Sequence, residues 1–232
     1  TAAIVSLAVF FSAFSAMALL SMSDQFYKAT VKDPASNFGG DVVVQLYDDA
    51  LVSPFKESIS GLQASGEITS ITEVGEMYGL SIKSSKSSKL EMLSLIGVSD
   101  SLYPLYGSVD VSGGLFNAIK DNGTIVLTKD LAKKLNVSVG DNIQIVPSDI
   151  FVSQSLKING IVESISDGNK GGMAYTNLNT LRSLGSATSS FLIRGDEPII
   201  EDAISKFFDT HENGGYYQTL SAYTKSQEKG AT

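Results

Sequence analysis

The hydrophobic pattern predicts a strand and then a helix near residue 41. The run 41–47 (DVVVQLY) is rich in valine, which is typical of a strand. In the segment that follows, Phe55, Ile59 and Leu62 recur at helical spacing. Ser53 is suited to cap this helix and Pro54 to its first turn. A single apolar stripe indicates a helix that buries one face.

Two strands are predicted next, at 67–83 and 89–98, with a serine-rich turn between them. Glycines within the first strand indicate β-bulges. Lys83, Lys86 and Lys89 lie in or beside the turn, where we expect solvated side chains rather than a contact with anionic lipid.

The middle of the chain predicts a strand-rich segment. A strand at 124–128 leads into a short helix whose Leu131 and Leu135 lie four residues apart. Thr128 is placed to cap this helix, and Asn136 is placed to end it. Gly140-Asp141 predicts a turn into another strand, and residues 99–123 predict a long connection without regular structure.

The C-terminal part repeats the order strand, helix, strand. A strand at 189–195 precedes a strongly signalled helix at 196–211, with Asp196 at its positive end and isoleucines and phenylalanines on one face. The strand 216–220 closes the unit, and we expect a polar exit at 221–232.

The N-terminal segment is hydrophobic and carries no charge before Asp24. Its length suffices for a helix that crosses a bilayer core of about 30 Å. A signal peptide would have a basic start and an initiator methionine, and a buried core helix would have a polar face. We therefore predict a transmembrane helix over 1–26 within a longer protein, with the residues after it outside the cytoplasm.

The order of elements predicts an α+β fold. Two strand–helix–strand units enclose a strand-rich middle, as in a split ferredoxin-like arrangement with an insertion. The predicted domains are 1–26, the transmembrane helix; 41–112, the first half of a porter-like subdomain; 113–187, an inserted β-rich subdomain; and 188–224, the second half of the porter-like subdomain.

Charge argues against a nucleic-acid surface. The formal net charge is −8 from 17 Lys and Arg against 25 Asp and Glu, and the two arginines, Arg182 and Arg194, are not clustered. The sequence has no cysteine, which excludes disulfides and thiolate metal sites.

Candidate catalytic chemistry is sparse. His211 is the single histidine, at a helix end where an imidazole commonly bonds the last carbonyls. The acidic pairs Asp48-Asp49 and Glu201-Asp202 lie beside helix starts or on helix surfaces, where capping and solvation explain them. We therefore predict no catalytic residue, no cofactor-binding residue and no metal ligand.

Several local motifs favour turns over binding sites. Asp167 and Asn169 lie in a stretch that superficially resembles a calcium loop but lacks its downstream glutamate. Asn122 and Asn136 match the glycosylation sequon, and both also suit turn or helix-end conformations. Tyr103, Tyr106, Tyr216, Tyr217 and Tyr223 suit a partner surface and half-buried positions equally well.

The order of motifs resembles the extracytoplasmic domain of FtsX/MacB-like ABC transporter permeases. The segment TIVLTKDLAKKLNVSVGDNIQI (124–145) is similar to a segment typical of this family, matching at Leu131-Ala132, Leu135, Gly140-Asp141 and Ile143. LIGVSDSLYPLY and VSGGLF upstream, and LKINGIVES and GMAYTNLNTLRSLG downstream, resemble family segments in the same order. Asn136 and Ser99 depart from the pattern, where Gly and Asp are more usual.

This resemblance implies a domain that transmits movement. Such permeases couple cytoplasmic ATP hydrolysis, on a separate subunit or domain, to movement of an outside domain that acts on lipoproteins, peptides, drugs or cell-wall hydrolases. The implied partners are the membrane, an ABC ATPase, a second copy of the permease and an extracytoplasmic substrate.

Two other functions stay open at this stage. A single-pass membrane-anchored binding or sensor module would have no second membrane helix after this segment. A surface hydrolase would need a nucleophile paired with a base, for which His211 is the one histidine.

Overall fold

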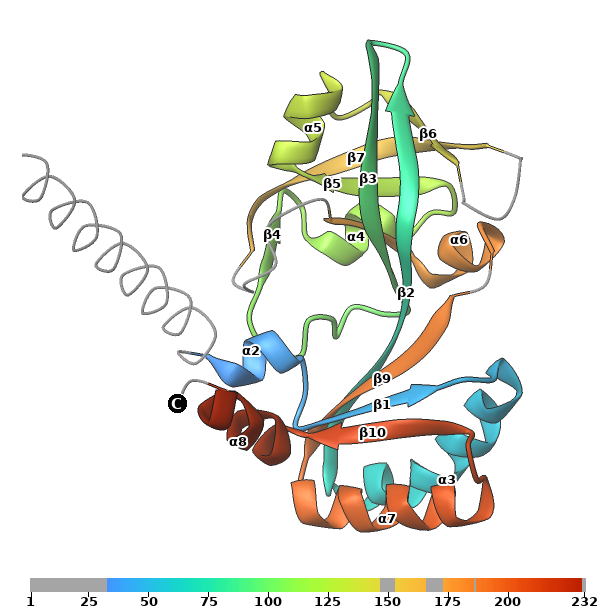
Figure 1. The fold of residues 1–232 in the computed structure, drawn as a ribbon, viewed down its shortest axis with the longest axis vertical. Helices are drawn as coiled ribbons and strands as arrows, with labels where there is room; N and C mark the ends of the chain where they lie inside the picture. The colour runs from blue at the N-terminus through green and yellow to red at the C-terminus, as the bar shows by residue number, and fades with distance from the viewer. Residues whose placement is uncertain (1–32, 147–152, 166–172, 186, 231–232) are drawn as a thin grey trace, which may run out of the picture.

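The computed structural model describes residues 33–146, 153–165, 173–185 and 187–230. The predicted transmembrane helix at 1–26 lies outside these residues, as does the calcium-like stretch with Asp167 and Asn169. Among the helices of the described part, none is both long and apolar enough to span a membrane. The predicted mixture of helices and strands is confirmed, with a large sheet at its centre (Figure 1).

The first part of the molecule is a four-stranded antiparallel sheet covered by two helices. Its strands have the order β10-β1-β9-β2, so segments from both ends of the chain share one sheet. The helices α3 and α7 lie together against this sheet at the bottom of Figure 1. These elements are β1 (Val42–Leu46), α3 (Val52–Ser65), β2 (Ile68–Ser84), β9 (Thr188–Gly195), α7 (Glu197–Thr210) and β10 (Gly215–Thr219).

Apolar side chains from the sheet and both helices form the core of this first part. Phe55 packs between Phe191 and Phe207, with ring centroids 4.8 and 5.3 Å away. The predicted stripe on α3 is confirmed at Phe55 and Ile59, which are fully buried. The helix α7 also begins as predicted, because the Asp196 carboxylate accepts a hydrogen bond from the Ile199 amide.

The second part is a closed barrel. Going around it, the neighbours are β2, β3, β8, β5, β7 and β6, and β6 pairs back onto the end of β2. Closure leaves no free sheet edge along this ring of strands. The additional strands are β3 (Ser87–Val98), β5 (Thr124–Thr128), β6 (Asn142–Val146), β7 (Gln154–Ile165) and β8 (Met173–Asn177).

The barrel has its own apolar core, to which two short helices contribute. Leu131 and Leu135 of α5 (Lys129–Leu135) bury against strand residues, as do Leu178 and Leu181 of α6 (Leu178–Ser183). Asn136 ends α5 in the left-handed conformation with φ 55°, as predicted. The barrel therefore stabilises itself largely by burying apolar surface independent of the first core.

The strand β2 connects the two parts. Its first half pairs with β9 and its last residues pair with β6, so one continuous strand belongs to both sheets. A further apolar cluster beside the barrel joins β3, β7 and β8 to α4 (Leu115–Ile119) and β4 (Val109–Val111). The two parts are thus joined by regular structure.

The structure corrects three local predictions in the first part and its connections. The helix α3 begins at Val52 rather than being capped by Ser53, because the preceding turn η1 (Asp49–Leu51) is capped by the Asp48 carboxylate, 2.8 Å from the Ala50 amide. The connection 99–123 contains β4 and α4, which form because β4 pairs with β7 and α4 buries Leu115 and Ile119.

The predicted polar exit is also wrong, because residues Leu220–Gly230 form the helix α8. It packs beside α2 (Pro34–Phe38), where Tyr223 stacks on Phe38 at 5.0 Å. Thr128 occupies the cap position of α5 without bonding it, and its buried hydroxyl has no hydrogen-bond partner among the described residues. Tertiary contacts therefore decide these segments more than local signals do.

Candidate functional site

The most polar buried feature lies on β2, where this strand passes from the first part to the barrel. Glu73 has a side chain that is 6% exposed, although it carries a carboxylate. Burial of a charge is costly unless partners compensate it. The position is therefore a candidate for a specific role at the junction of the two parts.

Two cations from different parts of the fold compensate Glu73. Lys56 of α3 places its Nζ 2.7 Å from Oε2, and Arg182 of α6 places an Nη2 2.6 Å from Oε1. Each oxygen therefore accepts one charge-assisted hydrogen bond, a strong class of protein hydrogen bond. The pair to Arg182 joins the barrel to the first part, because α6 follows a barrel strand.

Two further residues complete this cluster. The Ser189 hydroxyl donates to the Asp49 carboxylate at 2.9 Å, and Arg182 donates to the Ser189 oxygen at 3.3 Å. Asp49 lies 4.0 Å from Arg182. We call Lys56, Glu73, Arg182, Asp49 and Ser189 the junction cluster.

A cleft opens beside the junction cluster, between the end of β1 and the end of α6. Its volume is about 640 Å³. The cleft is lined on one side by Leu46, Tyr47, Asp48 and Asp49, and on the other by Arg182, Gly185, Ala187 and Thr188. Leu46 and Asp49 belong to the first part and Arg182 belongs to a helix packed on the barrel, so a change in the relative position of the two parts would change the width of this cleft.

The other arginine forms a second contact between the connection and the first part. Arg194 lies over the Tyr106 ring at 4.8 Å, and the Tyr106 hydroxyl donates to Asp41 at 2.7 Å. Burial raises the pKa of Tyr106, and its hydrogen bond to Asp41 adds to the effect. Both arginines of the chain thus bind segments that cross between the two parts.

Two facing glycines let α6 approach the strands near this junction. Gly75 on β2 and Gly97 on β3 are direct cross-strand partners. A Cβ on Gly97 would lie 2.7 Å from the Leu181 Cβ, and one on Gly75 would lie 2.6 Å from the Leu181 Cδ2. The absence of side chains at this pair therefore sets how closely Arg182, the next residue of α6, approaches Glu73.

The junction cluster suits holding, rather than reacting. Its charged groups are paired with one another, and its one hydroxyl, that of Ser189, is hydrogen-bonded to the Asp49 carboxylate and to Arg182. Within the described ranges, no group of His, Asp and Glu residues is placed to hold a metal ion.

Comparison with known proteins identifies the kind of domain. The model of the family described as MacB-like periplasmic core domain matches residues 2–206. The chain belongs to this family. No curated protein matches it by sequence.

Two solved structures have a similar fold. The periplasmic region of MacB from Actinobacillus actinomycetemcomitans is 12% identical, with a TM-score of 0.50, over 82% of this chain and 94% of that one. The extracellular domain of the noncanonic ABC-type transporter YknZ from Gram-positive bacteria is 16% identical, with a TM-score of 0.50, over 76% and 98%. The resemblance stated from the sequence is thereby confirmed at the level of the family and its fold.

In this MacB-like core domain the single histidine lies at the end of a helix and contacts that helix. His211 ends α7, where its Nδ1 lies 2.9 Å from the Phe207 carbonyl and its ring stacks on Phe207 at 4.3 Å. Asp48 caps a turn and Asp202 pairs with Lys206 one turn later, as expected, whereas Asp49 contacts Ser189 and Arg182 in the junction cluster. The structure does not bring these residues together into one site.

The structure also places the predicted Asn-Gly turn, the hairpin lysines and two of the tyrosines. Gly123, after Asn122, has φ 78°, which is consistent with the predicted turn. Of the three hairpin lysines, Lys86 is bound to the Asp141 carboxylate at 2.7 Å, rather than only solvated. Tyr216 and Tyr47 lie together on the first sheet with their ring centroids 6.2 Å apart, and both are exposed.

The sequence did not indicate the junction cluster of this core domain. Glu73 stands between Thr72 and Val74 in a predicted strand, and Arg182 stands in a short predicted helix, 109 positions away. The one available signal was that Arg182 is one of two arginines, which says nothing about its partner. Only the pairing of β2 with β9 and the packing of α6 reveal the contact.

Proposed function

We propose that this domain is the extracytoplasmic part of an ABC transporter permease and transmits movement driven by cytoplasmic ATP hydrolysis to a substrate or partner protein outside. The observation that carries this proposal is membership of the MacB-like periplasmic core domain family. The ATPase would be a separate subunit or domain, and the full permease would act as a homodimer. In this proposal residues 1–26 are the transmembrane helix, and the chain beyond residue 26 lies outside the cytoplasm.

The architecture supports different roles for the two parts of the fold. In this proposal the strands β1, β2, β9 and β10, with α3 and α7, form a split porter-like subdomain of ferredoxin-like topology. The barrel is the inserted subdomain, and the β2–β3 hairpin contributes to both. Since β2 continues through both cores, with a bulge at Gly79 between them, displacement of one subdomain is passed to the other along this strand.

The junction cluster would keep this link rigid. Glu73 is held from α3 and from α6, which lie on different sides of the junction. Rotation of the barrel about the junction would separate Arg182 from Glu73. This separation would cost free energy, because the Glu73 carboxylate would lose one of its two cationic partners. In this proposal the domain carries no catalytic residue, and its role is mechanical.

Spin labelling of the full-length permease tests this function. A cysteine replacing Lys129, whose side chain is 71% exposed on the barrel, would carry one nitroxide per copy. We expect a distance between the labels of two copies in a bilayer disc, and a shift of this distance when the ATPase binds ATP. Lys206→Cys on α7, 72% exposed, reports on the porter-like subdomain in the same way.

Each negative outcome has a distinct meaning. Absence of any distance between copies would rule out the homodimer. If the distances at both positions do not change when the ATPase binds ATP, coupling to ATP hydrolysis would be ruled out. A full-length protein that does not co-purify with an ATPase would instead favour the single-pass binding or sensor module.

A further inference from the structure

The strand β10 leaves one edge of the first sheet open. It lies at the end of the strand order, and β1 is its one strand neighbour in the described part of the chain. Two helices also contact it: α7, which packs on a face of the sheet, and α8, which follows directly after the strand. In Figure 1 neither helix runs along the outer edge of β10, so the described elements leave this edge uncovered.

The hydrogen bonds to β1 show which backbone groups of β10 point outward. The Tyr47 amide donates to the Gly214 carbonyl at 2.9 Å, and the Leu220 amide donates to the Asp41 carbonyl at 2.8 Å. In an antiparallel pair, such bonded positions alternate with positions whose amide and carbonyl point away from the neighbour. Both bonds place Tyr217 among the latter positions. Its amide and carbonyl have no hydrogen-bond partner among the described residues.

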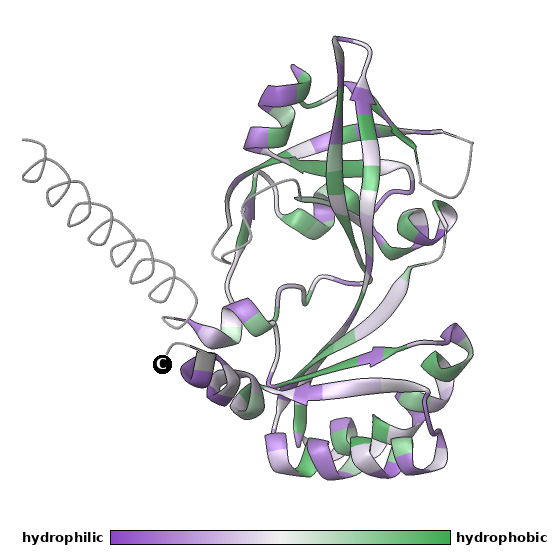
Figure 2. Cartoon of the chain, in the orientation of Figure 1, coloured by the Kyte–Doolittle hydropathy of each residue, from purple (hydrophilic) through white to green (hydrophobic). Residues whose placement is uncertain are grey.

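This edge lacks the features that usually keep edge strands from pairing with another strand. Exposed edges commonly carry a charge, a proline or a bulge. The sequence of β10 is GYYQT, and its register with β1 has no irregularity. Figure 2 shows most of this strand at intermediate hydropathy, in contrast to the strongly hydrophilic positions on α7. An additional strand would therefore meet neither a charge nor a kink along β10.

A second copy of β10 matches the backbone of this edge. Tyr217 is the middle residue of the strand, so two antiparallel copies related by a twofold axis would place Tyr217 opposite itself. Each Tyr217 amide would then donate to the Tyr217 carbonyl of the other copy. In the same register Gly215 would lie opposite Thr219, so the paired segment would extend over the whole strand.

The side chains of the two copies match as well. Tyr217 lies on the side of the sheet that faces α7, where its ring stacks on Phe208 with the centroids 6.1 Å apart. The two Tyr217 rings would meet there, and aromatic residues form favourable cross-strand pairs. Because side chains alternate along a strand, Tyr216 and Gln218 lie on the opposite side. Tyr216, which is 49% exposed, would lie beside Gln218 of the other copy.

We propose that two copies of this domain pair through β10, joining their four-stranded sheets into one continuous sheet. The inference rests on the proposed function, since a homodimer in one membrane supplies the second copy at a high local concentration. A pair of short strands is only marginally stable in water, so this membrane attachment is needed for the pairing. A second copy is favoured over a strand of another protein because β10 complements itself and carries no charged side chain that would select a foreign sequence.

Disulfide formation between two copies of the full-length permease tests this register. The chain has no cysteine, and any cysteine elsewhere in the full-length protein would be replaced. One tagged copy carries Tyr216→Cys, and a differently tagged copy carries Gln218→Cys. These positions would lie directly opposite, with Cα atoms about 4.5 Å apart, which is within the range of a disulfide.

The same variants distinguish the proposed register from other arrangements. Two copies of the Tyr216→Cys variant would have their Cα atoms more than about 7 Å apart, which is too far for a disulfide. The same holds for two copies of the Gln218→Cys variant. We therefore expect the mixed pair to crosslink at least about tenfold more than either variant with itself.

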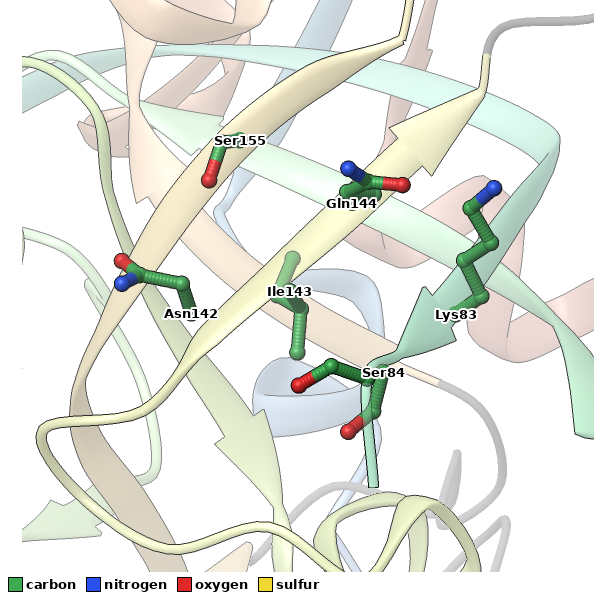
Figure 3. Close-up of a pocket in the computed structure, with 7 residues that line it drawn as sticks. Lys83, Ser84, Asn142, Ile143, Gln144 and Ser155 are labelled. Atoms are coloured by element: carbon green, nitrogen blue, oxygen red, sulfur yellow. The ribbon is translucent and has the colours of Figure 1, made fainter. Parts of the chain in front are cut away.

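A matched control uses exposed positions on the barrel. Gln144 and Ser155 are direct partners on β6 and β7, and they border a depression of about 350 Å³ (Figure 3). Both residues are exposed, as Tyr216 is. Gln144→Cys in one copy with Ser155→Cys in the other should give only the background crosslinking of colliding molecules.

Replacement of Tyr217 tests the hydrogen bonds of the edge. Tyr217→Pro removes an amide that bonds nothing in the described part of its own copy, and proline is tolerated at such edge positions. Tyr217→Ala, the matched control, removes the same ring but keeps the amide. Added to both copies of the mixed pair, Tyr217→Pro should reduce the disulfide about tenfold relative to Tyr217→Ala, because two hydrogen bonds across the twofold axis are lost.

Thermal unfolding of the solubilised variants checks the fold. Tyr217→Pro and Tyr217→Ala should have similar melting temperatures, because neither change removes a hydrogen bond to β1. If the proline variant does not fold, the mixed pair decides alone, since its two substitutions lie on the side of the sheet that faces away from α7.

Five results would overturn the pairing: no disulfide in the mixed pair, no more disulfide than in the barrel control, equal crosslinking of one variant with itself, a disulfide to another protein, or equal effects of proline and alanine in folded variants. Co-purification of the two tagged copies and of the ATPase is measured on the same samples. If all three co-purify without the disulfide, only this pairing is wrong. If the two copies do not co-purify, the homodimer of the proposed function itself fails.

Discussion

The Oε1 of Glu73 lies 2.6 Å from the Nη2 of Arg182, so a single ion pair joins residues 109 positions apart. One partner is in a strand that runs through both cores, and the other is in a helix packed on the barrel. The pair therefore couples the orientation of the barrel to that of the first sheet.

Glu73→Gln should lower the free energy of unfolding by about 2 kcal/mol, because a neutral amide replaces the acceptor of two charge-assisted bonds. The loss is moderate because both cations, Lys56 and Arg182, are partly exposed and regain water. Urea unfolding followed by circular dichroism measures this change. Glu163→Gln, which removes an exposed pair with Lys129, is the matched control and should change stability by less than about 0.5 kcal/mol.

Gly97→Ala should destabilise the fold by about 1 to 3 kcal/mol, because the added Cβ collides with Leu181 and displaces α6. The control is Gly61→Ala on α3, where nothing lies within 4 Å of the added methyl group. That change should stabilise by about 0.5 to 1 kcal/mol, since alanine favours the helix. Melting temperatures of the two variants should therefore move in opposite directions; a shift of the same sign would contradict this packing of α6 on the strands.

Substitutions at Asn136 should distinguish the energetic cost of its left-handed backbone conformation from the contribution of its side chain. Asn136→Gly should be neutral or stabilise by up to about 0.5 kcal/mol, and Asn136→Ala should destabilise by about 1 kcal/mol, because φ is positive there. Equilibrium unfolding of both variants gives the comparison. Equal stability of the Gly and Ala variants would show that the backbone at this position is not constrained.

Lys86→Met should raise the pKa of Asp141. The hydrogen bond from Lys86 is the main cause that holds this pKa below its ordinary value, and the Ser138 amide adds a smaller contribution. The lowered pKa means that the pair stabilises the fold above the pKa of the unfolded aspartate, about 4, and that this stabilisation disappears as the pH falls through the folded pKa. Carboxyl NMR titration of Asp141 measures the shift; an unchanged pKa would contradict the contact.

Local chemistry made part of the fold predictable. Asp196 begins α7, Asn136 ends α5, and glycines mark a bulge in β2, because each of these features depends on neighbours in the sequence. The family could be inferred from the order of such segments. The strand–helix–strand units at both ends were visible because their apolar periodicity is strong.

Long-range pairing could not be predicted in the same way. Closure of the barrel depends on β6 meeting the last residues of β2, and the local patterns of the two strands do not specify this contact. The exposure of Leu90 and Met92 on β3 could not be predicted for a different reason. In β3 both alternating sets contain apolar residues, Leu90 and Met92 in one and Leu93 and Leu95 in the other, so the sequence does not show which set is buried.

The position of β1 has a consequence for how the protein is made. Its two sheet neighbours are β9, which begins at Thr188, and β10, which begins at Gly215. While the chain is being synthesised, β1 therefore stays without either neighbour until almost the whole domain has left the ribosome, whereas most barrel strands find neighbours earlier. A chain that stalls before residue 188 would expose the valines of β1, and its rapid removal by proteases would be the signature of this order of assembly.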